Sequence, residues 1–579
     1  MSQTRRPSGS SISTNVRKRL KTAVRRANYA SRYHELRLKG KHPLRLLGTP
    51  KDPWLGSVAI GSHILADRFY IDGQCLRNPD HDKGDWPGGA IWRATGLDRE
   101  TMAYLHSFCW LRDLNRVVDR KAARHRAMAL TDHWLRQFDR WHAVAWAPDI
   151  LGRRIVNWLA HAPLILDSAD LVYRSKLLNC LARQARHLYH CGDDMLRGLP
   201  RLRAIGGLVM AGLYIPYGED WLKKGAALLT KALAAEIGPD GDISGRNPED
   251  LYRALRDLIM IRSALRAMGH ESPADLERVI PRMAAMLEKL RHGDGKLALF
   301  NGAGEQDGRE IAAALEIAAT IGDPAAVTDP DKSSFRRLEK GGTVVIADMA
   351  PPPAVDVSEQ GHAGTLSFEM SRGKQRIIVN CGAARGRPGE TEPDLSRLCR
   401  STAAHSTVVL NDKNSSEIRK DGRLGRAPSR VSGRQFAEQG HGLLDACHDG
   451  YLARFGLLHH RMIYLNDRGD DLRGEDILEQ ARGGAGKAAG LSATRFDVRF
   501  HLHPDIIVFL QKAPTGAVLR LPNGEVWQFH SAGGDLTLGE SLYLGAGRAQ
   551  KCRQIILSGQ TTAAKTVIKW SLFRGEGVP

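Results

Sequence analysis

The spacing of hydrophobic residues divides the chain into two parts. From about residue 98 to residue 321, apolar residues recur at intervals of three and four, the period of an amphipathic helix. This pattern predicts helices over Met102–Val117, Ala122–Phe138, Ile155–Leu166, Tyr173–His190, Ala204–Tyr214, Glu219–Glu236, Pro248–Ala267, Pro273–Leu290 and Glu310–Ile321. Helices of similar length joined by short turns suit antiparallel hairpins arranged in a ring or an array.

The pattern changes near residues 323–330, where short alternating runs replace the helical period. These runs predict strands at Gly342–Asp348, Thr365–Met370, Gln375–Cys381, Ser406–Leu410, Leu457–Leu465, Arg499–Leu502, Ile506–Leu510, Val526–His530 and Thr566–Phe573. Many short strands without long helices between them are typical of an antiparallel β-sandwich. A helical half followed by a strand half implies two packed domains with a ligand cleft between them.

We therefore expect a basic tail at 1–45, a helical domain at 46–325 and a strand domain at 326–579. The chain carries a formal net charge of +20, and the tail holds much of that excess because Glu35 is its one acid. A net charge of this size attracts polyanions. We expect the tail to be a solvated, disordered arm, with contact to a polyanion or a membrane surface as the alternative. Nucleic acid is not the expected partner.

Targeting and cofactor signals are absent from the sequence. No apolar run is long enough for a transmembrane helix, and the basic N-terminus lacks the apolar core of a secretory signal. The eight cysteines show no CxxC spacing, which argues against a zinc ribbon and a disulfide scaffold. We expect a cytoplasmic protein without a cofactor, with the cell envelope or periplasm as the alternative.

Three clusters contain residues that could carry chemistry. Arg246 and Asn247 precede a predicted helix, where a cation beside a helix N-terminus favours an anion. His362 and His405 each lie in a turn of small residues just before a strand, and Arg400 is near the second. Imidazole is the usual general acid or base near neutral pH, although a single buried histidine is more often structural.

A weaker candidate group lies on the predicted helix that contains Arg154, Asn157 and Trp158. Together these residues could bind a carboxylate, a hydroxyl and the face of a sugar ring, although helical aromatic residues more often pack in a core. The sequence contains no P-loop, nucleophile elbow or HExxH motif. Nucleotide-driven chemistry and serine hydrolysis are therefore not expected.

In these clusters the sequence resembles the heparinase II/III-like proteins, relatives of lyases that act on heparan-type polymers and alginate. The resemblance spans about Asp52 to Phe573 and is carried by Trp146–Trp158, Asp240–Pro248, His362–Gly382 and Arg400–Thr407. It implies an α+β multidomain fold, in which an N-terminal (α/α) toroid precedes a C-terminal antiparallel β-sandwich. It also implies an acidic polysaccharide as partner and an active cleft between the domains.

The reaction that the resemblance implies is β-elimination next to a uronic acid. Such an enzyme neutralises the sugar carboxylate, removes the C5 proton and protonates the leaving oxygen. The expected catalytic residues are His405, Tyr252 and His362. The expected substrate-binding residues are Arg246, Asn247, Arg400, Arg154, Asn157, Trp158 and Gln360.

Three positions depart from the family pattern. Gln360 replaces a catalytic histidine and cannot transfer a proton, while Asp250 stands where a tyrosine is expected, two residues before Tyr252. Some relatives hold a structural zinc at positions that correspond to His362, Asn380 and His405. Because Asn380 is neutral and a poor zinc ligand, no metal is expected here.

Other hypotheses follow from these departures. A protein that binds an acidic cell-envelope polysaccharide without cleaving it is the principal alternative to the lyase. A glycoside hydrolase would need paired carboxylates, for which Asp240 and Asp242 near Glu369 are the weak candidates.

Overall fold

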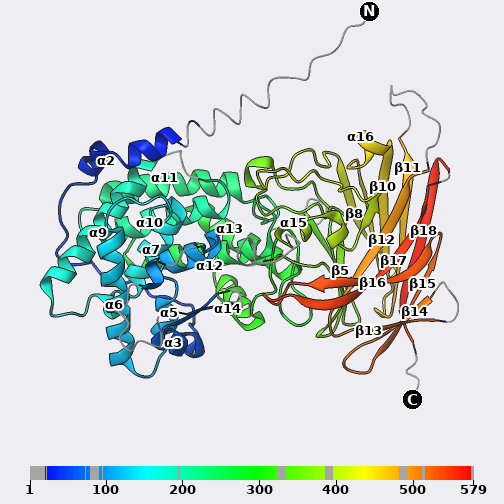
Figure 1. The fold of residues 1–579 in the computed structure, drawn as a ribbon, viewed down its shortest axis with the longest axis horizontal. Coiled ribbons are helices and arrows are strands. Elements are labelled where there is room, and N and C mark those ends of the chain that lie inside the picture. Colours follow the sequence, from blue (N-terminus) through cyan, green and yellow to red (C-terminus); the bar gives the residue numbers. More distant parts are fainter. Residues whose placement is uncertain are drawn as a thin grey trace, which may run out of the picture.

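A computed structural model describes the chain at residues 20, 23–71, 74–77, 90–93, 96–191, 196–322, 333–384, 395–481, 493–511, 516–561 and 563–575. Over these residues a helical domain is followed by a domain of antiparallel strands, and the two lie side by side along the long axis of the molecule (Figure 1). The expected boundary between residues 325 and 326 lies outside the described residues, as do residues 1–19 of the expected tail.

The later part of the expected tail is not a solvated arm. Helix α2 (Arg32–Arg37) is N-capped by Ser31, and His34 on this helix is buried. His34 Nε2 lies 2.9 Å from His187 Nδ1, and Glu35 forms an ion pair of 2.6 Å with Arg183. Because these partners lie on a long helix of the helical domain, this segment belongs to that domain's surface.

The helical domain is an (α/α) toroid of antiparallel neighbours. Its helices are α3 (Val58–Leu65), α4 (Arg99–His106), α5 (Leu111–Leu114), α6 (Arg120–Phe138), α7 (Pro148–Ala160), α8 (Ala162–Ile165), α9 (Leu171–Cys191), α10 (Leu199–Tyr214), α11 (Glu219–Glu236), α12 (Pro248–Ala267), α13 (Ala274–Lys289) and α14 (Gly308–Ala319). A small hairpin of β1 (Arg68–Ile71) and β2 (Gln74–Arg77) accompanies them. Proline in the first turn of α7, α10 and α12 fits the helix start, where backbone N–H groups have no partner.

Two expected helices have different bounds in the structure. The segment Met102–Val117 is broken between α4 and α5 at Phe108, whose φ of 57° cannot continue a helix. The expected Ile155–Leu166 helix starts earlier, at Pro148, and is interrupted at His161 before the short α8. At the first of these breaks, Phe108 packs against Trp158 at a ring distance of 5.2 Å.

The strand domain is a sandwich of two antiparallel sheets. One sheet has the order β16-β17-β12-β6-β5-β4-β3, with β7 paired to β12, and the other has the order β13-β14-β15-β18-β11-β10-β9-β8. The strands are β3 (Phe335–Lys340), β4 (Thr343–Asp348), β5 (Phe368–Arg372), β6 (Gln375–Val379), β7 (Val408–Leu410), β8 (Val431–Glu438), β9 (His441–His448), β10 (Leu457–Leu465), β11 (Asp471–Gln480), β12 (Arg495–Leu502), β13 (Ile507–Leu510), β14 (Gly516–Arg520), β15 (Val526–Ala532), β16 (Asp535–Tyr543), β17 (Gln550–Gln560) and β18 (Lys565–Arg574).

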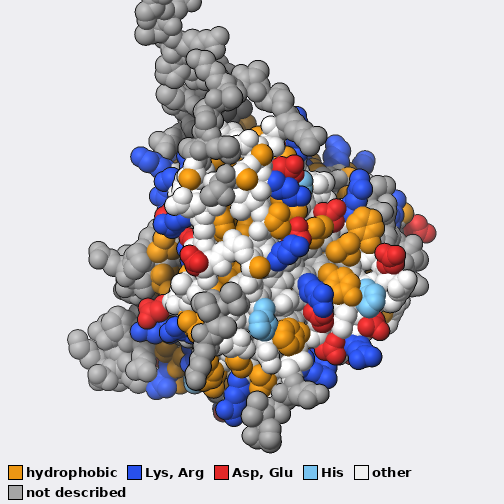
Figure 2. Space-filling view, turned by 90° about the vertical axis from the view of Figure 1, so that its right-hand side faces the viewer, with side chains coloured by type: hydrophobic (Ala, Val, Ile, Leu, Met, Phe, Trp, Pro, Cys, Tyr) orange, Lys and Arg blue, Asp and Glu red, His pale blue; other side chains and the backbone are white. Residues whose placement is uncertain are grey.

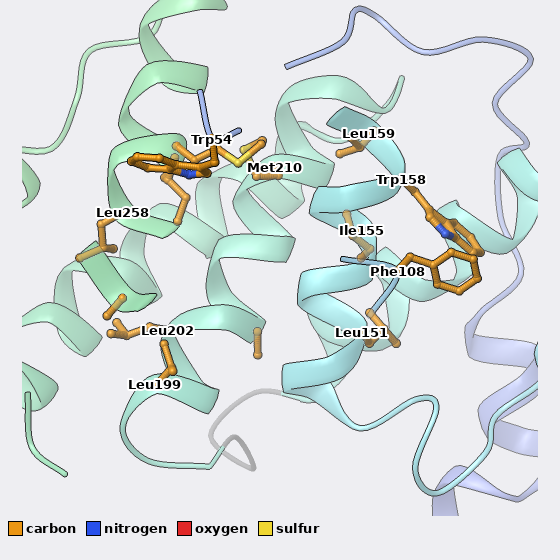
Figure 3. Close-up of a cluster of buried hydrophobic side chains, with 14 of the residues drawn as sticks. Trp54, Phe108, Leu151, Ile155, Trp158, Leu159, Leu199, Leu202, Met210 and Leu258 are labelled. Atoms are coloured by element: carbon orange, nitrogen blue, oxygen red, sulfur yellow. The ribbon is translucent and has the colours of Figure 1, made fainter. Parts of the chain in front are cut away.

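Each domain has its own hydrophobic core. The core of the toroid includes Trp158 on α7 and Phe108, which Figure 3 shows next to each other. The core of the sandwich lies between its two sheets and includes Trp527 and Trp570. Seen from the sandwich end, the surface mixes hydrophobic and charged side chains instead of presenting one kind (Figure 2).

The contact between the domains is buried and combines apolar packing with polar pairs, since Phe335, Val344 and Ile346 of the sandwich belong to the toroid's hydrophobic cluster. His292, after α13, lies 2.9 Å from Glu369 on β5, and Arg376 on β6 forms an ion pair of 2.9 Å with Asp294. Groups of this kind are costly to bury unless each has a partner. The two domains are therefore held together by apolar packing and by specific hydrogen bonds at their junction.

Candidate functional site

A cleft of about 670 Å³ opens between the toroid and the sandwich. Residues of α4, α7, α10 and α12 form one wall, and the sandwich loop at residues 356–360 with Arg423 forms the other. The charged and aromatic side chains on the wall are Tyr70, Arg99, Glu100, Tyr104, Arg112, Asp113, Asp149, Arg153, Arg197, Arg203, Asp250, Arg253, Asp356, Glu359 and Arg423. Seven arginines and six acids suit a ligand that carries both carboxylates and hydroxyls.

Helix N-termini meet at this cleft. Asp149, Leu199 and Asp250 lie in the first turns of α7, α10 and α12, and all three line the wall. The helix dipole makes such ends favourable for anions, although Asn247 already accepts hydrogen bonds from two first-turn N–H groups of α12. First-turn acids offset part of this positive potential, so the arginines deeper in the cleft contribute most of the attraction for a negative group.

Most of the cleft arginines already have acidic partners. Arg112 forms an ion pair of 2.7 Å with Asp52, and Arg197 forms one of 2.6 Å with Glu236. Arg153 differs, since within the described part of the chain no carboxylate lies at ion-pair distance from its half-buried guanidinium. Arg153 is thus the cleft cation with the most capacity left for a ligand.

The pKa of one cleft carboxyl, that of Asp113, lies above its ordinary value. Burial raises the pKa of Asp113 to about 6, even though Asp113 Oδ1 accepts a hydrogen bond of 2.7 Å from the Ser57 backbone N–H. A carboxyl with a pKa near the working pH can act as a general acid or base. Neither the sequence clusters nor the resemblance pointed to this residue.

Two of the expected site residues meet on the cleft wall. Asn247 caps α12 by accepting hydrogen bonds from the N–H groups of Glu249 and Asp250. Its Nδ2 donates to Gln360 Oε1 at 3.0 Å, and both side chains line the cleft. Gln360 is therefore placed where a ligand could be bound, and its amide can donate and accept hydrogen bonds but transfers no proton.

Arg246 does not lie in the cleft, contrary to expectation. Its guanidinium donates to Asp348 Oδ1 at 2.7 Å and to the carbonyls of Ala350 and Pro351 at 3.1 and 2.7 Å. Arg246 is buried and has a φ of 52°, which turns its side chain toward the sandwich. These bonds use its donors to join the two domains, and Arg246 does not line the cleft where a substrate-binding role was expected.

The two candidate histidines form a buried pair behind the cleft. His362 Nδ1 lies 3.0 Å from His405 Nε2, and His405 Nδ1 lies 2.7 Å from the Ser401 carbonyl. Burial lowers the pKa of His405 to about 4 and that of His362 well below its ordinary value. Both rings are thus neutral, and among the described residues no histidine lines the cleft.

Arg400 supports the same region from behind. Its Nε and Nη2 donate to the Gly361 carbonyl at 2.9 and 2.7 Å, and Nη2 also donates to the Ser358 carbonyl. These bonds hold the loop that presents Gln360. Arg400 therefore shapes the cleft wall without lining it.

The residues at the expected zinc position do not fit a zinc ion. His362 and His405 bond to each other through the nitrogens that would face a shared ion, and Asn380 Oδ1 accepts the Ser406 N–H at 3.0 Å. His362 Nε2 has no partner within the described residues, but a single nitrogen is too little for a structural zinc site.

Tyr252 faces away from the cleft. Its hydroxyl donates to Glu310 at 3.0 Å and accepts from Arg256 at 2.9 Å, and burial raises its pKa. It does not line the cleft. A phenol held in this position cannot reach a substrate between the domains.

The three candidates on α7 belong mainly to the toroid interior. Arg154 is fully buried and donates to the carbonyls of His106 and Ala145, and its guanidinium lies 4.3 Å from the Trp134 ring. Trp158 packs in the core, and Asn157 donates to the Ser107 carbonyl at 2.8 Å. Asn157 also lines a small pocket next to the cleft.

The carboxylates considered for hydrolysis also lie at the domain junction. Asp240 accepts the Ser334 N–H at 2.8 Å, and Asp242 accepts the Ser334 hydroxyl at 2.7 Å. Glu369 is bonded to His292. None of these acids lines the cleft, so the structure does not support the hydrolase hypothesis.

Asn301 is a junction residue that the sequence analysis missed. Its Nδ2 donates to the Arg246 carbonyl at 3.0 Å, its Oδ1 accepts the His362 N–H at 3.1 Å, and its carbonyl accepts from Asn247. The Asn301-Gly302 pair was the available signal, since Asn-Gly pairs favour left-handed turns. In the structure Asn301 has a φ of 47°.

The domain architecture has known counterparts. The structure superposes on heparinase III with a TM-score of 0.69 and 14% identity, over 90% of this chain and 85% of that chain. Heparan sulfate lyase HepC from Pedobacter heparinus gives a TM-score of 0.57 and 15% identity, over 90% and 83%. These likenesses confirm the predicted fold, a toroid followed by a β-sandwich. In the described part of the chain, no helix is both long and apolar enough to span a membrane.

Sequence comparisons give the family. Residues 323–571 match the model described as "Heparinase II/III-like, C-terminal". The chain is also 31% identical over 568 residues to FtsZ-localized protein C of Caulobacter vibrioides, across 96% of this chain and 94% of that protein. The chain therefore belongs to the heparinase II/III-like family.

Proposed function

We propose that the chain binds an acidic, uronic-acid-containing polysaccharide in the cleft between its two domains. The observation that carries this proposal is Arg153, a half-buried guanidinium on the cleft wall with no acid partner among the described residues. Arginine binds carboxylates through paired hydrogen bonds. Cleft acids can accept hydrogen bonds from sugar hydroxyls, and Tyr70 and Tyr104 lie on the same wall.

The geometry favours binding over cleavage. β-Elimination needs a base and an acid within hydrogen-bond reach of the sugar. The three residues expected in those roles, His405, Tyr252 and His362, are buried outside the cleft wall, and Gln360 transfers no proton. We therefore propose a binding protein built on a lyase fold.

A polymer panel tests this proposal. The purified protein is titrated with alginate, heparan-type chains and bacterial capsule, while the ultraviolet absorbance of unsaturated uronate is followed in the same samples. We expect saturable binding to at least one uronate polymer without a rise in absorbance, and no binding to a neutral glucan. Absence of binding to every uronate polymer would reject the proposal.

A lyase is the second candidate, and Asp113 is the observation that favours it. Its pKa of about 6 and its position in the cleft with Tyr104 would allow proton transfer to a bound sugar. A rise in absorbance that is lost in Asp113→Asn, with polymer affinity unchanged, would establish elimination. A rise that survives this substitution would reject Asp113 as the catalytic group.

The Caulobacter relative adds a cellular setting. That protein's name states that it is localized with FtsZ, and its identity to this chain extends over nearly the whole length. We propose that this chain also localizes with FtsZ and binds its polysaccharide there. A fluorescent fusion that fails to overlap with FtsZ in dividing cells would reject this setting but not the binding activity.

A further inference from the structure

A second, smaller pocket adjoins the cleft inside the toroid. It has a volume of about 80 Å³ and is lined by five arginines (Arg112, Arg153, Arg203, Arg253, Arg256) and a single acid, Asp257. The first four arginines also line the cleft, so the two spaces adjoin at these side chains. Trp54 and Met210, which Figure 3 shows next to each other, belong to its apolar wall.

Glycines bring the arginine-bearing helices together. A side chain at Gly152 on α7 would lie 2.2 Å from the Arg203 carbonyl on α10, and one at Gly207 would lie 2.4 Å from the Gly152 Cα. On the next face of α10, a side chain at Gly206 would lie 2.8 Å from Ile261 on α12. Three helices thus approach closely at small residues, and Arg153 and Arg203 become neighbours as a result.

The charges of this pocket are not balanced from within. Arg203 has Asp257 at 3.3 Å, while Arg153 has no carboxylate at ion-pair distance among the described residues. Burial and the nearby charge of Arg153 lower the pKa of Arg203 to about 10. Two adjacent guanidinium groups that share so little negative charge repel each other unless an anion lies between them.

We propose that this inner pocket binds an oxyanion substituent of the glycan, with Arg153 and Arg203 as its paired ligands. The inference rests on the proposed function for the polymer that carries the substituent. The volume has room for roughly five water molecules, at about 15 Å³ each, which is enough for a carboxylate, sulfate or phosphate group. A sugar ring is too large, so the pocket selects the charged group while the ring stays in the cleft.

Thermal unfolding with small anions tests the pocket directly. The wild type, Arg153→Gln and Arg203→Gln are melted with inorganic phosphate, sulfate, acetate or glucuronate, with sodium chloride added to keep ionic strength constant. Arg454→Gln, on the exposed helix α16 (Leu452–Phe455) of the sandwich, is the matched control. We expect at least one oxyanion to raise the wild-type and control midpoints by about 2–4 °C.

Both pocket variants should respond differently from the wild type. Without anions, Arg153→Gln should melt at or above the wild-type midpoint because the repulsion is relieved, and added oxyanions should not raise its midpoint. Arg203→Gln should also lose the oxyanion response. Loss of the response in two separate pocket variants makes misfolding of either one an insufficient explanation. An equal response in all four proteins, or no response in any, would overturn the pocket assignment.

The anion series and the polymer panel separate the two proposals. Polymer binding that is weakened by Arg153→Gln but unaffected by Arg203→Gln would overturn the paired-arginine pocket and leave the proposed function intact. Oxyanion protection without binding to any uronate polymer would overturn the proposed function and identify a free anion as the pocket's ligand. A preference for glucuronate and acetate over phosphate would assign the substituent as a carboxylate, and the reverse preference as a phosphate or sulfate.

Discussion

The interdomain cleft and the junction behind it contain the same types of side chain but use them differently. At the junction, Arg246 donates to Asp348 and to backbone carbonyls, and His362 bonds to His405. In the cleft, Arg153 lacks an acid partner among the described residues. What distinguishes a binding wall from a structural joint is therefore whether the polar side chains still have free hydrogen-bonding capacity, more than which residue types are present.

The largest expected effect comes from removing the junction arginine. Arg246→Met would leave the Asp348 carboxylate buried without its cation, and burial already raises the pKa of Asp348. We expect a loss of about 3–5 kcal/mol in unfolding free energy. Chemical denaturation followed by tryptophan fluorescence measures it. Arg266→Met, an exposed arginine paired with Glu277 at 3.7 Å, is the control and should change stability little.

A smaller loss is expected at the histidine pair. His405→Ala removes the ring that packs on Gly364 and leaves the His362 N–H without an acceptor. A buried donor without a partner costs about 1–3 kcal/mol. Polymer affinity should stay within about twofold of the wild type, because His405 does not line the cleft. A stable His405→Ala protein that no longer binds would place this pair in the site after all.

A third, smaller effect is expected in the pH dependence of the unfolding free energy. His106 accepts a hydrogen bond of 3.0 Å from Trp134, and burial lowers its pKa to about 3. Because the folded pKa lies below the unfolded value of about 6.5, the unfolded state binds more protons between these limits. The contribution of His106 to the unfolding free energy is fully present above about pH 6.5. It falls by roughly 1 kcal/mol per pH unit as the pH decreases toward the folded pKa.

The matched variant for this test is His106→Asn, which keeps an acceptor but takes up no proton. Its unfolding free energy should fall less steeply than that of the wild type between about pH 6 and pH 4. Other buried groups act in both proteins, so the difference between the two slopes isolates His106. Parallel slopes would show that His106 is not held neutral in the fold.

Much of the fold could be predicted from periodicity and much of the site could not. The predicted bounds of α11, α12 and β10 agree with the structure, because caps such as Asn247 and clean alternation define them locally. Edge and polar strands such as β8 and β16 were missed, since their side chains are largely exposed and lack apolar alternation.

The site was harder because it depends on contacts between distant segments. The donors of Arg246 are used by Asp348, which lies 102 residues further along the chain. Arg153 and Arg154 are adjacent in sequence, but the helix turns one toward the cleft and the other into the core. The one available signal was the glycine pattern of α7 and α10, which marks close helix contacts.

The most direct test of glycan binding in the cleft compares oligouronate affinity in Arg153→Glu and Arg454→Glu with that of the wild type at fixed salt. Both substitutions change net charge equally, but only the first reverses a cation on the cleft wall. We expect at least a tenfold loss of affinity for Arg153→Glu, about 1.4 kcal/mol, and little change for Arg454→Glu. Equal affinities in the two variants would contradict this expectation and place the glycan outside the cleft.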